Sequence, residues 1–372
     1  MTNRLTSALG VDTPIVLGPF GGMSSIDLTA TVSERGGLGS FGLYGYDADR
    51  IAETAAALRA ATGRPFALNL WVPTGDEAQP DDVDIDAALA LVAPLYTELD
   101  LALPTAPPVH FLVPFEEQLE AVRDAAPAAV SFVFGMPDRS AIDALRSRGI
   151  RIIGIATTVA EAVAVVEAGA DVVVATGAEA GGHRVSFLAS AEASLVGVLS
   201  LVPQVVDAVE VPVVAAGGIA ERRGVAAAFA LGAAGVQVGT AFLRTAQSAA
   251  SAAHRAALDG VRDDGTVLTR AVTGRLARGI PNRLIGLMEE TATILPFPAQ
   301  AWVLQPVRAE ALRRGWGDLQ SLWAGQSAPL ARLDDAGDVF AELAAGIPHA
   351  ETIGVHARIT PVKPEASAHS AP

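Results

Sequence analysis

The sequence predicts an α/β protein: a (β/α)8 TIM barrel with a small helical subdomain appended over the barrel mouth. Runs rich in β-branched residues alternate along residues 1–245 with alanine-rich segments of helical length. Eight of these runs have the character of strands, which is the number in a closed barrel. Glycine-rich turns follow many of them, whereas an open doubly wound sheet, the alternative fold, would concentrate glycine at a single turn.

The predicted strands are almost continuously apolar, as expected of parallel strands that are covered on both faces. They occupy residues 14–17, 38–41, 66–70, 129–134, 151–155, 171–175, 212–215 and 235–238. Helices are predicted between them at residues 25–35, 47–61, 138–148, 159–168 and 221–231. Glycine follows close behind each of these helices, where a left-handed backbone conformation costs it little.

Two regions exceed a minimal barrel. Residues 71–128 are acidic at their start and rich in proline, so we expect a helix, an irregular crossing and an extra strand or hairpin at 109–113. We expect the barrel domain to span residues 1–245. Residues 246–345 follow the last strand and are expected to form a helical subdomain over the mouth of the barrel, where it would cap the substrate. The C-terminal segment, 346–372, ends in a tail with the composition of a disordered segment.

Charge and composition exclude several classes of function. The chain of 372 residues has 26 basic and 41 acidic residues, a net charge of −15, which argues against nucleic acid or an anionic membrane as partner. The absence of cysteine removes disulfides, thiolate nucleophiles and cysteine metal ligands. No signal peptide or membrane span is evident, so we expect a cytoplasmic protein. The sequence leaves a homo-oligomer open.

Two glycine turns stand where barrels commonly bind phosphate. Gly217 and Gly218 follow the seventh predicted strand, and Gly239 and Thr240 follow the eighth. Their backbone N–H groups, with the threonine hydroxyl, could hold a phosphate group. The alternative is that these glycines only permit tight turns.

His183 is the only histidine in a predicted strand-end loop, the glycine-rich segment 177–184. A neutral imidazole there could take a proton from carbon or hold an anion. The alternative is a histidine that merely hydrogen-bonds to backbone. No metal-ligand spacing, nucleophile elbow or Walker A motif is present, and Lys363 is the only lysine, which argues against Schiff-base chemistry. We expect Arg275, Arg278 and Arg283 to form a solvated or interface face, with a role in substrate binding as the alternative.

Several sequence blocks, in order from about residue 14 to about residue 333, resemble the nitronate monooxygenase family, also called 2-nitropropane-dioxygenase-like proteins. They include GPFGGMSS, EAGGHR, AAGGI, QVGTAF, TGRLARGIPNR and LWAGQS. The resemblance implies an FMN-binding barrel with a small helical domain. Members oxidise alkyl nitronates, and often nitroalkanes, with O₂ to carbonyl compounds and nitrite. Close relatives on the same scaffold are flavin-dependent enoyl reductases and NAD(P)H:quinone reductases.

The resemblance also implies roles for individual residues. His183 matches the family histidine that acts as catalytic base or substrate anchor. The implied cofactor-binding residues are Pro19, Phe20, Gly21, Asn69, Thr176, Gly181, Gly217, Gly218, Gln237, Val238, Gly239 and Thr240. No metal ligand is implied.

This chain departs from the family pattern near the flavin ring and the substrate. Phe20 replaces a usual methionine, Val133 a frequent histidine, Thr176 a usual glutamine and Val185 a common glycine, whereas the phosphate turns match well. We therefore expect FMN-dependent oxidation of a nitronate or nitroalkane with O₂. Two alternatives remain: an NAD(P)H-dependent flavin oxidoreductase acting on quinones or enoyl thioesters, and a non-catalytic FMN-binding barrel.

Overall fold

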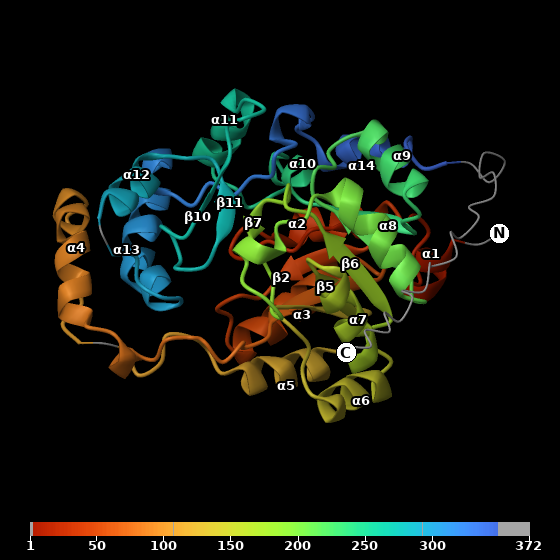
Figure 1. The fold of residues 1–372 in the computed structure, drawn as a ribbon, viewed down its shortest axis with the longest axis horizontal. Coiled ribbons are helices and arrows are strands. Elements are labelled where there is room, and N and C mark those ends of the chain that lie inside the picture. Colours follow the sequence, from red (N-terminus) through yellow and green to blue (C-terminus); the bar gives the residue numbers. More distant parts are fainter. Residues whose placement is uncertain (1–2, 107, 292, 349–372) are drawn as a thin grey trace, which may run out of the picture.

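The barrel is an eight-stranded, all-parallel sheet whose strands follow the order β1-β9-β8-β6-β5-β4-β3-β2 (Figure 1). The computed structural model describes residues 3–106, 108–291 and 293–348. A bridge between Val16 and Leu38 joins the two outer strands and closes the sheet. The barrel strands are β1 (Ile15–Leu17), β2 (Gly39–Gly42), β3 (Phe66–Trp71), β4 (Ala129–Val133), β5 (Arg151–Ala156), β6 (Val172–Thr176), β8 (Val213–Ala216) and β9 (Gly235–Val238). The predicted fold class is confirmed, and every predicted strand forms within one or two residues of its expected bounds.

Helices surround the sheet. They are α1 (Arg4–Leu9), α2 (Ile26–Glu34), α3 (Ala48–Ala61), α5 (Phe115–Ala125), α6 (Arg139–Ser147), α7 (Val159–Ala168), α8 (Val198–Ala208), α9 (Arg222–Ala230), α10 (Thr240–Leu243) and α14 (Ala336–Ala344). The helices predicted from the sequence are confirmed as α2, α3, α6, α7 and α9. Side-chain caps start two of them: Ser25 accepts from the N–H of Leu28, and Asp47 accepts from the N–H of Arg50.

Strand residues alternate between the barrel interior and the helix layer. Val172 and Val174 of β6 pack in the interior cluster, and Val173 and Ala175 pack in the cluster that contains the outer helices. Leu5 of α1 belongs to the interior cluster. Both faces of each strand are therefore buried, which explains the continuous apolar runs in the sequence.

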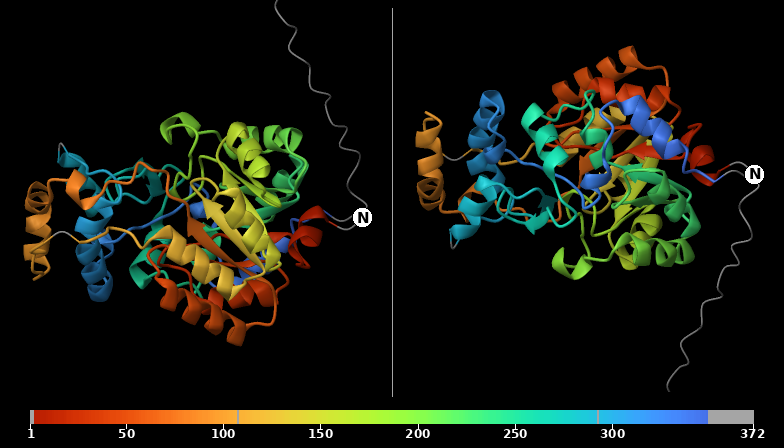
Figure 2. Two further views of the ribbon diagram at one scale, coloured as in Figure 1. Left: turned by 90° about the horizontal axis from the view of Figure 1, so that it is seen from below. Right: turned by 90° about the horizontal axis from the view of Figure 1, so that it is seen from above.

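A second lobe lies beside the barrel. It contains α4 (Ile85–Glu98), α11 (Ala252–Gly260), α12 (Arg283–Glu290) and α13 (Ala299–Arg314). Both views of Figure 2 place α4 beside α13, on the side of α13 that is farther from the barrel, and residues of α4, α12 and α13 share one apolar cluster. Short 3-10 turns lie at Pro80–Asp82, Glu192–Ser194, Gly317–Leu319 and Ala328–Leu330.

The expected domain bounds remain a proposal, and the packing adds detail to them. The helix α4 comes from the early part of the chain but packs with residues 271–319, whereas Phe340 of α14 packs with Leu28 and Val32 of α2 on the barrel. The expected disordered tail falls on residues 349–372, which lie outside the described residues.

One expected element is wrong and one was missed. Residues 109–113 form no strand; Val109 is 85% exposed, so this segment lacks the cover that would stabilise a strand there. Beyond the barrel, β10 (Val267–Thr269), β11 (Ala277–Gly279) and β7 (Gly182–His183) form a three-stranded antiparallel sheet that was not predicted. This sheet matters because it carries His183.

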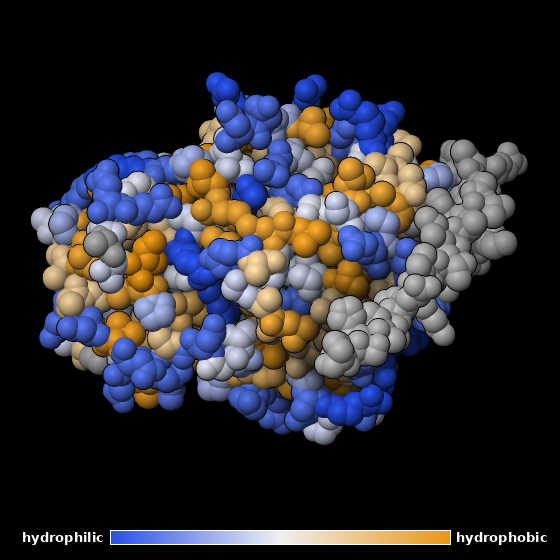
Figure 3. Space-filling view, in the orientation of Figure 1, coloured by the Kyte–Doolittle hydropathy of each residue, from blue (hydrophilic) through white to orange (hydrophobic). Residues whose placement is uncertain are grey.

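The surface shown in Figure 3 is continuous over lobe and barrel, with hydrophilic residues along its upper and lower edges and apolar residues between them. Among the described residues, no helix has the length and apolar character needed to cross a bilayer.

Candidate active site

A cavity of about 240 Å³ opens at the C-terminal ends of the barrel strands, beneath residues of the second lobe. Every residue predicted for the site lines this cavity except Val238. The lobe contributes Thr273, Phe297 and Arg308. The cavity is therefore built jointly by the two parts of the chain.

The side chain of Val238 lies outside the cavity. It is 1% exposed and packs in the apolar cluster between the strands and the outer helices. Neighbouring residues of a strand face opposite sides, so the exposure of Gln237 and Gly239 to the cavity turns the Val238 side chain away from it. Only backbone atoms of Val238 could contact a ligand.

The glycine turns have the backbone conformation that their sequence suggested. Gly217 has φ +96° and Gly218 has φ +72°, in the left-handed region that other residues avoid. A Cβ at Gly217 would lie 3.0 Å from the backbone nitrogen of Ala180. The turn thus approaches the loop after β6 so closely that a side chain at Gly217 would force the backbone apart.

The segment 322–327, LWAGQS, completes this end of the cavity. Gly325 donates its N–H to Oγ1 of Thr240 at 3.0 Å, and both Gly325 and Ser327 line the cavity. A Cβ at Gly181 would lie 2.6 Å from the backbone of Ala324, so the two segments pack backbone against backbone. Gly325 and Ser327 were missed as site residues, although the block that contains them was recognised.

Two polar side chains of the cavity wall have an atom without a protein partner in the part of the chain that the structure describes. The hydroxyl of Thr176 is buried and has no hydrogen-bond partner among the described residues. The amide nitrogen of Asn69 donates to the carbonyl and the hydroxyl of Ser131 at 3.1 and 2.9 Å, and no described residue donates to its Oδ1. An unpaired buried hydroxyl is costly, and the Oδ1 of Asn69 can still accept a hydrogen bond, so both side chains are suited to a polar ligand in the cavity.

His183 stands in the cavity wall. Its Nε2 lies 2.8 Å from Oγ1 of Thr273, so its partner is a side chain and not the backbone. Its ring centroid is 4.9 Å from that of Trp71 and 5.4 Å from that of Trp323. Burial, together with the positive charges of Arg275 and Arg308, lowers the pKa of His183 to about 3, so the imidazole is neutral at neutral pH.

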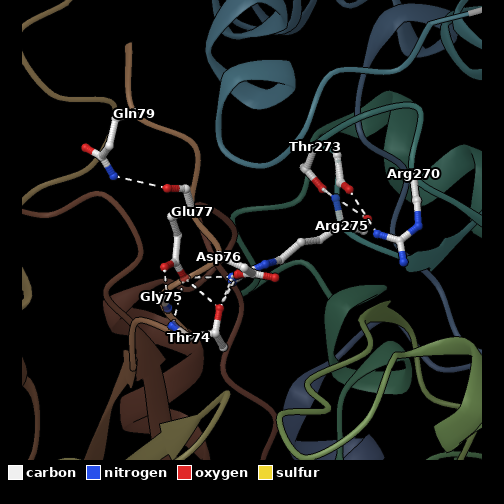
Figure 4. Close-up of polar contacts among 9 residues, drawn as sticks. Thr74, Gly75, Asp76, Glu77, Gln79, Arg270, Thr273 and Arg275 are labelled. Carbon is white, nitrogen blue, oxygen red and sulfur yellow. Dashed lines mark hydrogen bonds and ion pairs between the residues drawn. The ribbon is translucent and has the colours of Figure 1, made fainter. Parts of the chain in front are cut away.

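Arg275 ties the lobe to the loop after β3 (Figure 4). Its guanidinium contacts Asp76 at 2.8 Å, Glu77 at 2.7 Å and the hydroxyl of Thr74 at 2.6 Å. Burial alone would raise the pKa of Glu77, but hydrogen bonds from Thr74 and Arg275 and the charge of Arg275 hold it below its usual value. The positive charge of Arg275 is therefore compensated by two carboxylates.

The expected arginine face is therefore wrong for two of its three members. The side chain of Arg275 is only 11% exposed, and Arg278 of β11 is buried with its Nε donating to the carbonyl of Ala178. Both belong to the segment that forms the unpredicted sheet. Arg283 is partly exposed and pairs with Glu98, as expected of a solvated residue.

Aromatic rings separate the cavity from a smaller one of about 50 Å³. Tyr44, Trp71 and Phe297 line both cavities, with ring centroids of Tyr44 and Trp71 4.5 Å apart. Burial raises the pKa of Tyr44, against the charges of Arg308 and Arg275. The sequence could have indicated Tyr44, which lies two residues after the end of β2, but Phe297 carries no such signal.

Comparison with known proteins identifies the family. The family described as "Nitronate monooxygenase" matches residues 2–346 of this chain. The chain belongs to the nitronate monooxygenase family. It is thus an oxidoreductase of this family, built on the barrel and cavity described above.

Individual relatives agree. The chain is 41% identical over 337 residues to nitronate monooxygenase of Pseudomonas aeruginosa, covering 89% of this chain and 95% of the relative. It is 39% identical over 330 residues to a probable nitronate monooxygenase of Staphylococcus saprophyticus, covering 88% and 92%.

Solved structures share the fold. Nitroalkane oxidase from Streptomyces ansochromogenes has 36% identity and a TM-score of 0.82, covering 92% of this chain and 97% of its own. FabK from Thermotoga maritima has 27% identity and a TM-score of 0.72, covering 92% and 95%.

Proposed function

We propose that the protein is an FMN-dependent enzyme that oxidises alkyl nitronates, and nitroalkanes as further substrates, with O₂ to a carbonyl compound and nitrite. The observation that carries this proposal is a single cavity that combines two glycine turns, an unpaired Thr176 hydroxyl and a neutral His183. The family membership and the names of its relatives supply the reaction class.

The residues at the strand ends fit FMN. Gly217, Gly218 and Gly239 would present backbone N–H groups to the phosphate, with the hydroxyl of Thr240 beside them. Thr176 and Asn69 would meet polar atoms of the ring, which explains why their cavity-side atoms have no protein partner. When bound, FMN supplies the electron transfer and the reaction with O₂.

His183 would act as a neutral group. With a pKa of about 3 it carries no charge near pH 7, so it can accept a proton from a carbon acid or accept a hydrogen bond. It cannot by itself supply positive charge to an anion. The apolar wall at Val133 would accommodate the alkyl part of the substrate.

The experiment compares two reductants of the flavin. The purified protein, loaded with FMN, is mixed with propyl-2-nitronate or with NADPH, and nitrite, acetone and flavin absorbance are followed. We expect nitrite and acetone from the nitronate under air, and little bleaching by NADPH without O₂. Rapid bleaching by NADPH with no nitrite from the nitronate would favour the alternative, a reductase of quinones or enoyl thioesters.

A fold shared with an enoyl reductase domain does not decide for that alternative. The enoyl reductase domain of MlnA shares the fold with a TM-score of 0.66, although at 13% identity the likeness concerns the fold alone. A cytoplasmic location and a homo-oligomeric state are further proposals that rest on the sequence.

A further inference from the structure

Arg308 is a cation of the cavity without a counter-charge. It lies on α13 and lines the cavity, and its guanidinium donates to the carbonyl of Ala301 and the hydroxyl of Ser321, each at 3.1 Å, with a longer contact of 3.4 Å to the carbonyl of Leu304. All three acceptors are neutral. Among the described residues, no carboxylate forms an ion pair with it.

Other arginines near the cavity are compensated or turned away from it. Arg275 pairs with Asp76 and Glu77. The buried Arg184 donates to backbone carbonyls, including that of Gly177 at 2.6 Å, and does not line the cavity. Arg308 therefore differs from its neighbours in keeping an uncompensated charge at the cavity surface.

The carboxylate of the cavity wall is engaged elsewhere. Both carboxylate oxygens of Glu179 lie 3.0 Å from the backbone nitrogen of Val198, at the start of α8. His183 is neutral and adds no charge of either sign. Arg308 thus adds an unpaired positive charge on the side of the cavity where His183 and Tyr44 stand. Its charge, like that of Arg275, contributes to the low pKa of His183 and opposes the rise that burial causes in the pKa of Tyr44.

Arg308 is half-buried, and a cation withdrawn from water without a counter-ion is costly; part of that cost is recovered when an anion binds. The planar guanidinium has five N–H donors, of which the protein uses three, so two remain. A nitronate carries its negative charge on two oxygens that a guanidinium can bind side by side. A neutral nitroalkane presents two oxygens of similar spacing without the charge.

We propose that Arg308 is a specificity-determining residue that binds the nitronate group of the substrate, so that the cavity selects nitronate anions over neutral nitroalkanes. This inference rests on the proposed function. His183 then needs only to accept a proton or a hydrogen bond, while Arg308 holds the charge.

The test compares Arg308→Gln and Arg308→Lys with the wild type in the FMN-loaded protein. Propyl-2-nitronate is the anionic ligand and 2-nitropropane is the neutral one; where 2-nitropropane is not oxidised, its Ki against the nitronate replaces its KM. We expect Arg308→Gln to raise the KM for the nitronate about 10- to 100-fold, the range of a charge-assisted hydrogen bond, and to change the constant for 2-nitropropane less than about 3-fold. Lysine should recover part of the affinity, because it keeps the charge but loses the planar fork.

A second measurement does not need turnover. Trp71 and Trp323 line the cavity, so binding of propyl-2-nitronate without O₂ can be followed by tryptophan fluorescence. Arg313→Gln is the matched control, since Arg313 lies on the same helix, is 70% exposed and pairs with Glu310. Flavin content and unfolding temperature show whether each variant folds. If Arg308→Gln does not fold, the binding measurement is made with Arg308→Lys instead.

The outcomes separate the two proposals. If the wild type binds the nitronate but releases no nitrite, the proposed function fails while the role of Arg308 is still decided by the binding data. If Arg308→Gln weakens the nitronate and 2-nitropropane equally, or leaves the nitronate unaffected, the inference is overturned. Loss of flavin in both Arg308 variants would also overturn the inference, because Arg308 would then be needed to bind the cofactor and not the substrate.

Discussion

Nε2 of His183 and Oγ1 of Thr273 lie 2.8 Å apart although 90 residues separate them in the chain. The pairing depends on the small sheet, in which β7 carries His183 and β11 follows Thr273 by a short turn. Thr273 also accepts from the N–H of Arg275 at 3.4 Å. The lobe therefore fixes the orientation of the imidazole that the barrel loop supplies.

Replacement of His183 separates two roles for this residue. If His183 removes the α-proton, His183→Ala should abolish oxidation of 2-nitropropane but leave that of propyl-2-nitronate within about 10-fold, since the nitronate has already lost this proton. Nitrite release from both compounds measures the effect. His110→Ala, at an exposed residue, is the control. Equal rates of the wild type and His183→Ala on both compounds would remove His183 from the reaction.

The stability of the protein should depend on pH through its buried histidines. The pKa of His183 falls to about 3 on folding and that of His254 to about 4, below the ordinary value near 6.5. Between pH 6.5 and 5 the unfolded chain binds protons that the folded chain does not, so stability falls as the pH falls, by up to about 1.4 kcal/mol per pH unit for each histidine.

Urea unfolding at pH 7, 6 and 5 measures this dependence. His183→Gln should lose part of the slope, since one of the two histidines no longer titrates. An identical slope in the wild type and in His183→Gln would show that the imidazole of His183 is accessible to protons in the folded protein.

The glycine turn after β8 should be essential for flavin binding. Gly217→Ala combines a left-handed backbone with a Cβ 3.0 Å from the nitrogen of Ala180, so we expect little or no bound flavin. Gly10→Ala is the matched control, because Gly10 has φ +68° and nothing within 4 Å of its Cβ position. Absorbance near 450 nm per mole of protein is the measurement; full occupancy in Gly217→Ala would contradict the proposed cradle.

Thr176 should have opposite effects on stability and on binding. Thr176→Val removes an unpaired buried hydroxyl, so the flavin-free protein should be as stable as the wild type or more stable. Flavin affinity should fall by about 5- to 10-fold, the size of one neutral hydrogen bond. Thr176→Ser keeps the hydroxyl and should retain affinity. If Thr176→Val instead destabilises the flavin-free protein and leaves its affinity for flavin unchanged, the hydroxyl stabilises the fold and does not bind the flavin.

The sequence was sufficient for the barrel because its strands are buried on both faces and bounded by glycine, two local signals. It was insufficient for the small sheet, since β7 consists of Gly182 and His183 alone and two residues show no periodicity. Residues 109–113, which lie between prolines, carried an apolar run that the fold leaves exposed at Val109.

Similar limits apply to the site. The residues at strand ends could be predicted because every parallel barrel gathers them at one edge. Arg308 could not, because an arginine on a helix is usually solvated and only the placement of α13 over the barrel brings it into the cavity. Thr273 and Phe297 depend on the same long-range packing. The motif also did not show that the Val238 side chain faces away from the cavity, because a motif does not say which side of a strand each residue faces.

The most direct test of the account is the O₂-dependent release of nitrite from propyl-2-nitronate by the FMN-loaded protein, with the flavin-free Gly217→Ala protein as the blank. The account predicts continuous nitrite formation that requires both the flavin and O₂. A protein that is saturated with FMN, yet forms nitrite no faster than the blank, would contradict it.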